Sequence, residues 1–387
     1  MNNTFELQIP EALKTRISEI KAIQGSPFYL YDCAAIREHC LQFTALPYEP
    51  KAIHFALMAN SNPQFIRILK DCGLKVFVNS IPHLEQVLSL GFKGEEIVFA
   101  ASAMDEAKMK QAEGAGCLVV LDSVGQLELW SRLFPLQGAC LRCNIGDQVS
   151  PKQTLGGYFI GKDSRLGFTR EELQQLKGDP RIRGLHSYVG TNILQLSYFM
   201  DCYRKLSELA EWFPNLQVLD FGGGFGLSED PSQQLDLQDY GAQVSALMRQ
   251  LSLKLGAQIR LILEPGRIIG AEAGYFVCEV VDLKTRGKHQ LIGVNASCAQ
   301  FPRPLFYPDE AFHPVAILAQ NEAEANEEKI LSSIYGCSTY SRDFLARDIL
   351  LPPVKPGDTV ILGYAGSYCA SSYTHFLGFA PAREFFT

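Results

Sequence analysis

Residues 216–226 read LQVLDFGGGFG: an apolar run, an aspartate, and then three consecutive glycines with one more two residues later. The run is apolar on both faces of the strand it would form, which is typical of a parallel sheet covered by helices. Seven other runs of this kind alternate with longer amphipathic stretches that fit helices. The eight runs are residues 51–57, 74–79, 96–101, 117–122, 139–144, 182–188, 216–221 and 258–263.

Eight β-then-α repeats favour a closed (β/α)8 barrel of the TIM type. An open, doubly wound sheet is the alternative, because periodicity alone does not show whether a sheet closes. After about residue 272 the helical periodicity mostly disappears, and strand-like runs such as 275–283 and 359–362 follow. The predicted fold class is therefore α/β, a barrel plus a C-terminal β-rich domain. The expected domains are an N-terminal segment that joins the β domain (1–35), the barrel (36–271) and the β-rich domain (272–387).

The overall composition is that of a globular protein and argues against some classes of partner. The chain has 387 residues, of which 47% are hydrophobic, and 35 basic residues face 42 acidic ones, for a net charge of −7. This balance argues against a nucleic-acid partner or a membrane surface. We find no signal peptide or membrane-spanning run, so we expect a cytoplasmic protein whose eleven cysteines are mostly free thiols. Cys140 and Cys143 form a CxxC pair, but no second pair completes a zinc site, and we expect no metal.

Two loops stand out, because they follow the last two predicted barrel strands, where barrels often bind phosphate. Gly222, Gly223 and Gly224 would let backbone N–H groups approach an anion closely. The sequence EPGR, from Glu264 to Arg267, places a carboxylate at the end of the last strand and a guanidinium three residues later. A tight turn and a surface ion pair are the simpler alternatives. The occurrence of both loops at these two positions favours a phosphate site.

At this point the sequence resembles the fold-type III pyridoxal-phosphate decarboxylases, which include the diaminopimelate, ornithine/arginine and carboxynorspermidine decarboxylases. The resemblance extends over nearly the whole chain. Besides the glycine loop and EPGR, it rests on FALMANSNP (55–63), SRLGF (164–168), GLHSYVGTN (184–192), RPLFY (303–307), STYSRDFLARDILLP (338–352) and AGSY with FLGF (365–379). The resemblance implies an alanine racemase/ornithine decarboxylase-like fold, pyridoxal 5′-phosphate as cofactor, an amino-acid or diamino-acid ligand, and a homodimer in which two subunits share each active site.

The resemblance also implies roles for residues of this chain. Glu264 would pair with the ring nitrogen, where a protonated ring is the better electron sink for decarboxylation. The remaining cofactor-binding positions would be Tyr188, Thr191, Gly222, Gly223, Gly224, Gly266, Arg267 and Tyr368. Arg303 falls where some members hold a substrate carboxylate, and the substrate-binding positions would be Arg165, His186, Arg303 and Tyr307. The catalytic positions fall on Met58, Thr339, Tyr340 and Asp343.

Several of these positions depart from the family pattern. The family lysine that forms the Schiff base falls on Met58, and the cysteine that reprotonates product falls on Thr339. Cys337 would replace it only if the loop shifts by two residues. The histidine that stacks on the cofactor ring falls on Tyr188, whose ring can stack as well. A family aspartate near the second barrel strand falls on Phe77.

A thioether cannot act as an imine-forming nucleophile, so the chain is expected to be impaired in lysine-dependent chemistry. The simplest interpretation of the Met58 side chain itself is core packing. Met58 is either an engineered replacement of lysine in an active decarboxylase or a product of natural divergence, and the other departures favour divergence. The leading hypothesis is a decarboxylase scaffold that acts on or binds an amino-acid derivative, with the cofactor noncovalent or absent. The alternatives are a non-catalytic paralogue that binds a partner or metabolite, and an enzyme of altered chemistry.

Overall fold

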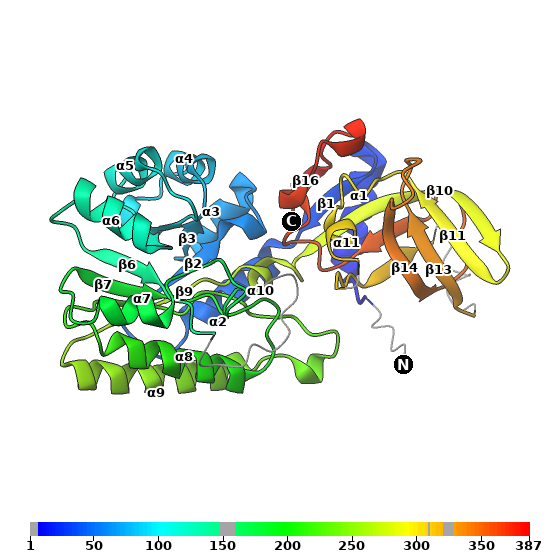
Figure 1. The fold of residues 1–387 in the computed structure, drawn as a ribbon. Helices are drawn as coiled ribbons and strands as arrows, with labels where there is room; N and C mark the ends of the chain where they lie inside the picture. Colours follow the sequence, from blue (N-terminus) through cyan, green and yellow to red (C-terminus); the bar gives the residue numbers. More distant parts are fainter. Residues whose placement is uncertain (1–6, 147–158, 309, 320–327) are drawn as a thin grey trace. The chain divides into compact units, whose positions relative to one another are not determined.

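The computed structural model describes residues 7–146, 159–308, 310–319 and 328–387. The chain forms two compact units. One comprises residues 37–268, and the other combines residues 1–36 with 269–387. Each unit is built around its own sheet (Figure 1).

The first unit is a closed barrel of eight parallel strands. The strands pair in chain order, and the last one pairs with the first and closes the barrel. The prediction of a closed barrel is thus confirmed, and the open sheet is wrong. The strands are β2 (Lys51–Ala56), β3 (Lys75–Val78), β4 (Ile97–Ala100), β5 (Leu118–Leu121), β6 (Ala139–Arg142), β7 (Ile182–His186), β8 (Val218–Asp220) and β9 (Arg260–Leu263).

Helices surround the barrel strands; in Figure 1, α4, α5 and α6 lie on one side and α8 and α9 on the other. Many of them begin at a residue whose side chain accepts a hydrogen bond from the first helical turn, as Asn62, Asp105 and Asp236 do. The helices are α2 (Cys33–Thr44), α3 (Pro63–Asp71), α4 (Ile81–Ser89), α5 (Glu106–Gly114), α6 (Val124–Leu133), α7 (Arg170–Gln175), α8 (Leu196–Ala210), α9 (Leu237–Leu255) and α10 (Arg267–Gly270). Short 3-10 turns are η1 (Leu57–Ala59), η2 (Gly94–Glu96) and η3 (Pro231–Gln233).

Two cores hold the barrel together. Small and β-branched side chains from alternate strand positions form an interior cluster, which also contains Phe77 and Cys140. Large residues on the other strand face, such as Phe99 and Leu185, are fully buried. Several of the predicted runs extend beyond the carboxyl end of the strand, as at 182–188, because the chain leaves the sheet once the strand ends, here at His186.

The second unit is a mixed sheet with strand order β12-β15-β10-β11-β13-β14. The N-terminal strand β1 belongs to this sheet, because it pairs with β10 and with the C-terminal strand β16. The elements are α1 (Glu11–Gln24), β1 (Phe28–Tyr31), β10 (Gly274–Arg286), β11 (His289–Val294), α11 (Arg303–Phe306), β12 (Val315–Leu318), β13 (Ile330–Tyr335), β14 (Phe344–Leu351), β15 (Thr359–Leu362), η5 (Ala370–Ser372), η6 (Phe376–Gly378) and β16 (Arg383–Phe386). The described residues include no helix with the length and apolar character that crossing a membrane requires.

The buried wall of the barrel predicts one stability effect. Phe99→Ala should lower the free energy of unfolding by about 3–5 kcal/mol, because it removes a fully buried ring and leaves a cavity. Leu136→Ala is the control, since this side chain is 98% exposed and its loss should change stability by less than about 0.5 kcal/mol. Urea titration followed by circular dichroism measures both. Equal effects of the two substitutions would contradict the assigned packing.

Candidate functional site

Most of the predicted barrel residues lie at or just beyond the carboxyl ends of the strands. Met58 lies in η1 directly after β2, His186 is the last residue of β7, and Glu264 follows β9. Met58 is 37% exposed, whereas its neighbours Leu57 and Ala59 are buried. The interpretation of Met58 as a packed core residue is therefore wrong. Its side chain is the one member of this turn that reaches the surface of the chain.

The glycine loop after β8 lies against the backbone of two neighbouring loops. The Glu264 N–H donates to the Gly222 carbonyl at 2.8 Å, which joins this loop to the end of β9. A Cβ atom on Gly223 would lie 2.3 Å from the Glu264 carbonyl oxygen. Gly222 and Gly224 have φ angles of +65° and +97°, and a Cβ on either would meet a backbone oxygen within 2.6 Å. All three positions therefore require glycine.

A cluster of three buried polar side chains lies beside this loop. His186, Asp220 and Glu264 are 1%, 0% and 4% exposed, and each offers an atom within 4.8 Å of the others. His186 Nε2 lies 3.4 Å from Glu264 Oε2. Three buried atoms of the cluster have no hydrogen-bond partner among the described residues: His186 Nδ1, Asp220 Oδ2 and Glu264 Oε1. Unsatisfied buried polar atoms are costly, so the cluster is suited to a ligand.

Burial shifts the pKa values of all three groups. Desolvation raises the pKa of Glu264 to about 8, while the adjacent Asp220 carboxyl and the charge of Arg142 lower it. Desolvation, and then the charge of Glu264, raise the pKa of Asp220 well above its ordinary value. Desolvation lowers the pKa of His186 to about 4, so its imidazole is neutral near pH 7. The carboxyls of the cluster therefore hold protons under conditions in which exposed carboxyls do not.

Arg142 and Asp122 are functional candidates that sequence reasoning missed. Arg142 ends β6, and its Nε lies 3.9 Å from Asp122 Oδ1 at the end of β5. Asp122 also accepts hydrogen bonds from the Ser102 hydroxyl at 2.7 Å and from the Gly167 N–H at 3.0 Å. It thereby fixes the SRLGF segment, whose Arg165 is exposed. The signal in the sequence is an arginine in an otherwise apolar strand, between the two cysteines of the CxxC pair.

Phe77 and Tyr188, which the resemblance aligns with a family aspartate and histidine, have aromatic neighbours at the strand ends. The Phe77 ring is nearly parallel to the His186 ring, with centroids 6.5 Å apart. The Tyr188 ring packs edge-on against Phe159 at 4.8 Å. Tyr188 Cε2 would also lie 3.6 Å from a Cβ on Gly223, so the phenol ring adjoins the glycine loop. Thr191 and Gly266 lie in the loops after β7 and β9, and Arg267 begins α10.

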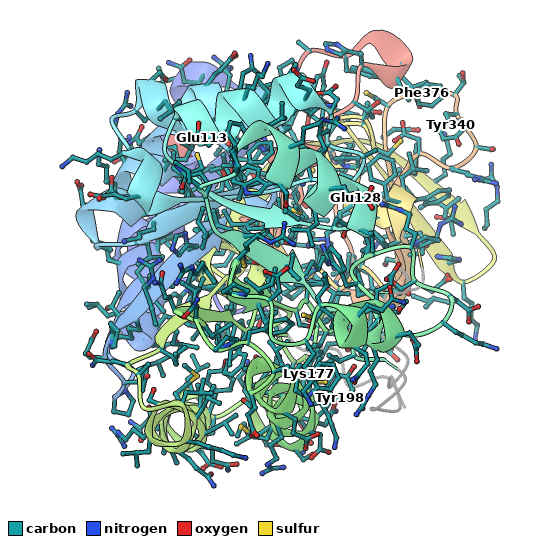
Figure 2. All side chains as sticks on the ribbon, turned by 60° about the vertical axis from the view of Figure 1, so that its left-hand side comes forward. Glu113, Glu128, Lys177, Tyr198, Tyr340 and Phe376 are labelled. Carbon is teal, nitrogen blue, oxygen red and sulfur yellow. The ribbon has the colours of Figure 1, made fainter. Side chains whose placement is uncertain are left out.

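The other predicted residues belong to the second unit. Asp343 is buried and accepts hydrogen bonds from the Cys298 N–H at 2.6 Å and from the backbone and hydroxyl of Ser338. These bonds show that it shapes the turn between β13 and β14. Thr339 in that turn is exposed, and Tyr340 packs edge-on against Phe376 at 5.2 Å (Figure 2). Arg303 is buried in α11, Tyr307 is 41% exposed, and Tyr368 has a φ of +58°.

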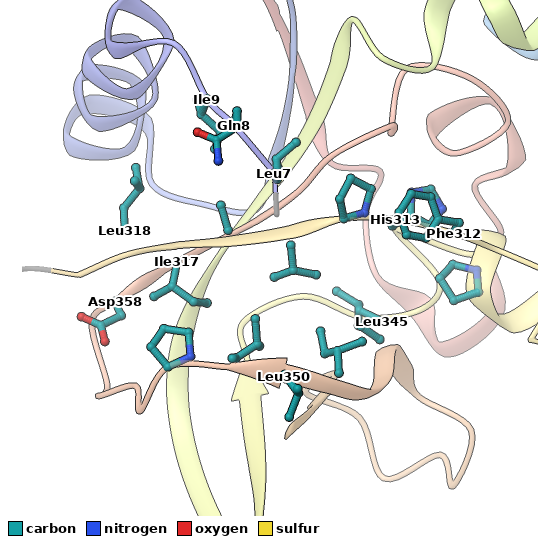
Figure 3. Close-up of a pocket in the computed structure, with 18 of the residues that line it drawn as sticks. Leu7, Gln8, Ile9, Phe312, His313, Ile317, Leu318, Leu345, Leu350 and Asp358 are labelled. Atoms are coloured by element: carbon teal, nitrogen blue, oxygen red, sulfur yellow. The ribbon is translucent and has the colours of Figure 1, made fainter. Parts of the chain in front are cut away.

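A cavity of about 1290 Å³ also lies in the second unit (Figure 3). Its walls include the first turns of α1 and the strands β12 and β14. Leu7, Ile317, Leu345 and Leu350 make much of the surface apolar. None of the site residues predicted from the sequence lines this cavity. It is therefore separate from the cluster in the barrel.

The buried cluster in the barrel could bind either of two kinds of ligand. His186, Asp220 and Glu264 are spaced closely enough for a metal ion, and Glu264 Oε1 can equally accept a hydrogen bond from a protonated ring nitrogen. The glycine loop beside the cluster favours the second kind, because its backbone is suited to a phosphate. The site thus defines a class of protein in general terms: a β/α barrel whose glycine loop and buried carboxyl are suited to a cofactor that carries a phosphate and a ring nitrogen.

The comparisons with known proteins name the family. Residues 33–271 match the family described as "Pyridoxal-dependent decarboxylase, pyridoxal binding domain". This match covers more than half of the chain, and the protein belongs to that family. Its cofactor, pyridoxal phosphate, is a phosphorylated heteroaromatic ring, and the glycine loop and the buried Glu264 fit such a group.

Curated relatives and solved structures agree with this assignment. Diaminopimelate decarboxylase of Escherichia coli K12 is 25% identical over 377 residues, which cover 91% of this chain and 86% of the relative. The enzyme of that name from Deinococcus radiodurans is 28% identical, with 91% and 88% covered. The crystal structure of diaminopimelate decarboxylase from Helicobacter pylori complexed with L-lysine has a TM-score of 0.83 at 22% identity and covers 96% of this chain and 94% of its own. The similarity to this solved structure shows that the two chains share a fold.

The raised pKa of Glu264 predicts how stability depends on pH. Between the ordinary value and about 8 the folded state holds a proton that the unfolded state has lost, so stability falls as the pH rises. The raised pKa of Asp220 likewise makes stability fall as the pH rises. The lowered pKa of His186 causes no further change in stability once the pH is above the ordinary value of a histidine. From pH 6.5 to 8 the wild type should therefore lose about 1–2 kcal/mol more than Glu264→Gln, which cannot ionise. Urea unfolding at the two pH values measures this difference, and parallel losses would contradict the buried-carboxyl assignment.

Proposed function

We propose that this protein binds pyridoxal phosphate, free or joined to an amino acid, in its barrel without a covalent bond to the chain. The observation that carries the proposal is the buried Glu264 Oε1, which has no hydrogen-bond partner among the described residues and belongs to a residue whose backbone contacts the glycine loop. Such an oxygen can accept from a protonated ring nitrogen. When bound, this cofactor supplies an electron sink for carbon–carbon bond cleavage next to an amine.

Different residues of the chain would contact the phosphate and the ring of the cofactor. Gly222, Gly223 and Gly224 provide a loop that a phosphate can approach closely, and Arg267 at the start of α10 adds a positive charge. Glu264 orients the ring, and Tyr188 beside the glycine loop offers a face for stacking. Arg142 and Asp122 hold the SRLGF segment at the ends of β5 and β6.

Met58 is the reason for proposing noncovalent binding. It stands where the resemblance places the lysine of the family, and a thioether forms no bond to an aldehyde. Lys51 belongs to the same strand, but it occupies the opposite end of β2 and pairs with Glu49. Lys162 is exposed in the segment before Ser164. Neither is positioned to take over the role of an amine at the end of β2.

The relatives support an amino-acid ligand. They are diaminopimelate decarboxylases, and structures of similar fold are described as complexed with L-lysine, putrescine or cadaverine. We therefore propose that the ligand is an amino acid or a diamino-acid derivative. Arg303 is the candidate for its carboxylate in this proposal, and Thr339 stands where the family has its proton-donating cysteine. A hydroxyl is a far weaker acid than a thiol near neutral pH.

The cofactor proposal is tested by binding and by reduction. Purified protein mixed with pyridoxal phosphate should bind it in equilibrium dialysis, yet sodium borohydride followed by mass spectrometry should show no added mass on any lysine. Met58→Lys should bind the cofactor covalently under the same conditions, which serves as the positive control. A reduced adduct on a lysine of the wild type would overturn noncovalent binding. Absence of any binding would favour the alternative of a paralogue that has lost the cofactor.

The phosphate loop gives a second test. Gly223→Asp should abolish binding, because it has no room beside the Glu264 carbonyl and adds a negative charge. Arg267→Ala should weaken binding by about 1–3 kcal/mol, as expected for a charge-assisted contact. Arg204→Ala is the matched control, since Arg204 is exposed on α8 and pairs with Asp201. Unchanged affinity in the first two variants would mean that the glycine loop is only a turn.

We also propose a homodimer, in which the second unit contributes the contact. Large apolar side chains of its short helical segments α11 and η6 are exposed, including Phe306 at 52%, Phe376 at 50% and Leu377 at 37%. Two-fold closure is the commonest way for a soluble chain to cover such a surface. Light scattering at micromolar concentration should give a mass near twice the 43.0 kDa of one chain. Phe376→Asp should shift it toward the monomer, and a 43.0 kDa particle for the wild type would reject the dimer.

A further inference from the structure

Asp220 lies between the two parts of the proposed cofactor site. Its Oδ1 accepts a hydrogen bond from the Gly222 N–H at 2.9 Å, at the start of the glycine loop. Its Oδ2 is buried, belongs to the cluster with Glu264 and His186, and receives no hydrogen bond from the described residues. The Asp220 side chain thus contacts the loop proposed for the phosphate and also adjoins the carboxyl proposed for the ring nitrogen.

The surroundings of Asp220 disfavour a second negative charge. Glu264 and Asp122 are acidic, and Cys140 and Tyr203 are neutral groups in the same buried region. Arg142 is the cation that acts on the cluster, and it already lies near Asp122. Two carboxyls so close together in a buried site do not both ionise near neutral pH. A protonated Asp220 has one O–H, and Glu264 is the acceptor beside it.

We propose that Asp220, as a protonated carboxylic acid, is a positioning residue: it donates to Glu264 and keeps that carboxyl in register with the glycine loop. One oxygen of Asp220 fixes the loop, and the other directs Glu264 so that Oε1 faces the ligand. The identity of the ligand rests on the proposed function, whereas the proton on Asp220 does not.

Infrared difference spectroscopy of the ligand-free protein tests the proton directly. At about pH 7 the wild type should show the carbonyl stretch of a protonated carboxylic acid, and Asp220→Asn should remove that contribution. Asp201→Asn is the matched control, because Asp201 is exposed in an ion pair on α8 and should leave the band unchanged. A spectrum that Asp220→Asn does not alter in this region would overturn the proposal.

Equilibrium dialysis with pyridoxal phosphate tests the positioning. Asparagine keeps both the acceptor for Gly222 and a neutral donor for Glu264, so Asp220→Asn should bind within about threefold of the wild type. Asp220→Leu keeps neither and should weaken binding by about tenfold or more. If Asp220→Asn loses more than tenfold in affinity while its melting temperature is unchanged, Asp220 does not act as a neutral donor. Full affinity in Asp220→Leu would reject that role as well. If the wild type binds no pyridoxal phosphate, the proposed function fails, and the infrared band still decides whether Asp220 carries the proton.

Discussion

The site depends on one close approach between two backbone segments. The loop after β8 and the end of β9 are joined by the hydrogen bond from the Glu264 N–H to the Gly222 carbonyl. Only a residue without a Cβ fits at position 223, because the Glu264 carbonyl lies 2.3 Å from where that atom would be. This contact places a loop suited to phosphate and a buried carboxyl side by side. The approach is possible because β8 and β9 are hydrogen-bonded neighbours in the barrel, so that the loops after them leave the same edge of the sheet.

That geometry has an electrostatic consequence. The backbone approach leaves the Glu264 and Asp220 side chains in the barrel interior, where desolvation favours their neutral forms. A buried carboxyl with an unsatisfied oxygen costs stability, and apolar residues of similar volume would often be better for folding alone. A cationic ring nitrogen would reverse the balance, because it would satisfy Glu264 Oε1 and stabilise its ionised form. The buried carboxyls therefore lower the stability of the free protein and would increase its affinity for such a ligand.

The sequence was sufficient for the barrel but not for the buried cluster. Apolar runs of strand length separated by amphipathic stretches are a local property, and β2 to β9 follow from them. The grouping of His186, Asp220 and Glu264 is not local, since it depends on which strands become neighbours and on which face each residue lies. Asp220 stood in the glycine motif without a role for this reason. The family pattern likewise gives Asp343 a catalytic position, while its hydrogen bonds to Cys298 and Ser338 show what it does within the turn.

Met58 changes less of the site than its position suggests. A lysine at the end of β2 would form a covalent bond, but in the proposed function the contacts to the phosphate and to the ring nitrogen would come from residues that follow β8 and β9 and begin α10. Those groups are intact, and the ring of Phe77 adds an apolar surface against His186. Drift without a ligand would give no reason to keep Asp220 and Glu264 buried, because their removal would relieve a cost. The buried carboxyls therefore support the proposal that this site binds its ligand without covalent attachment.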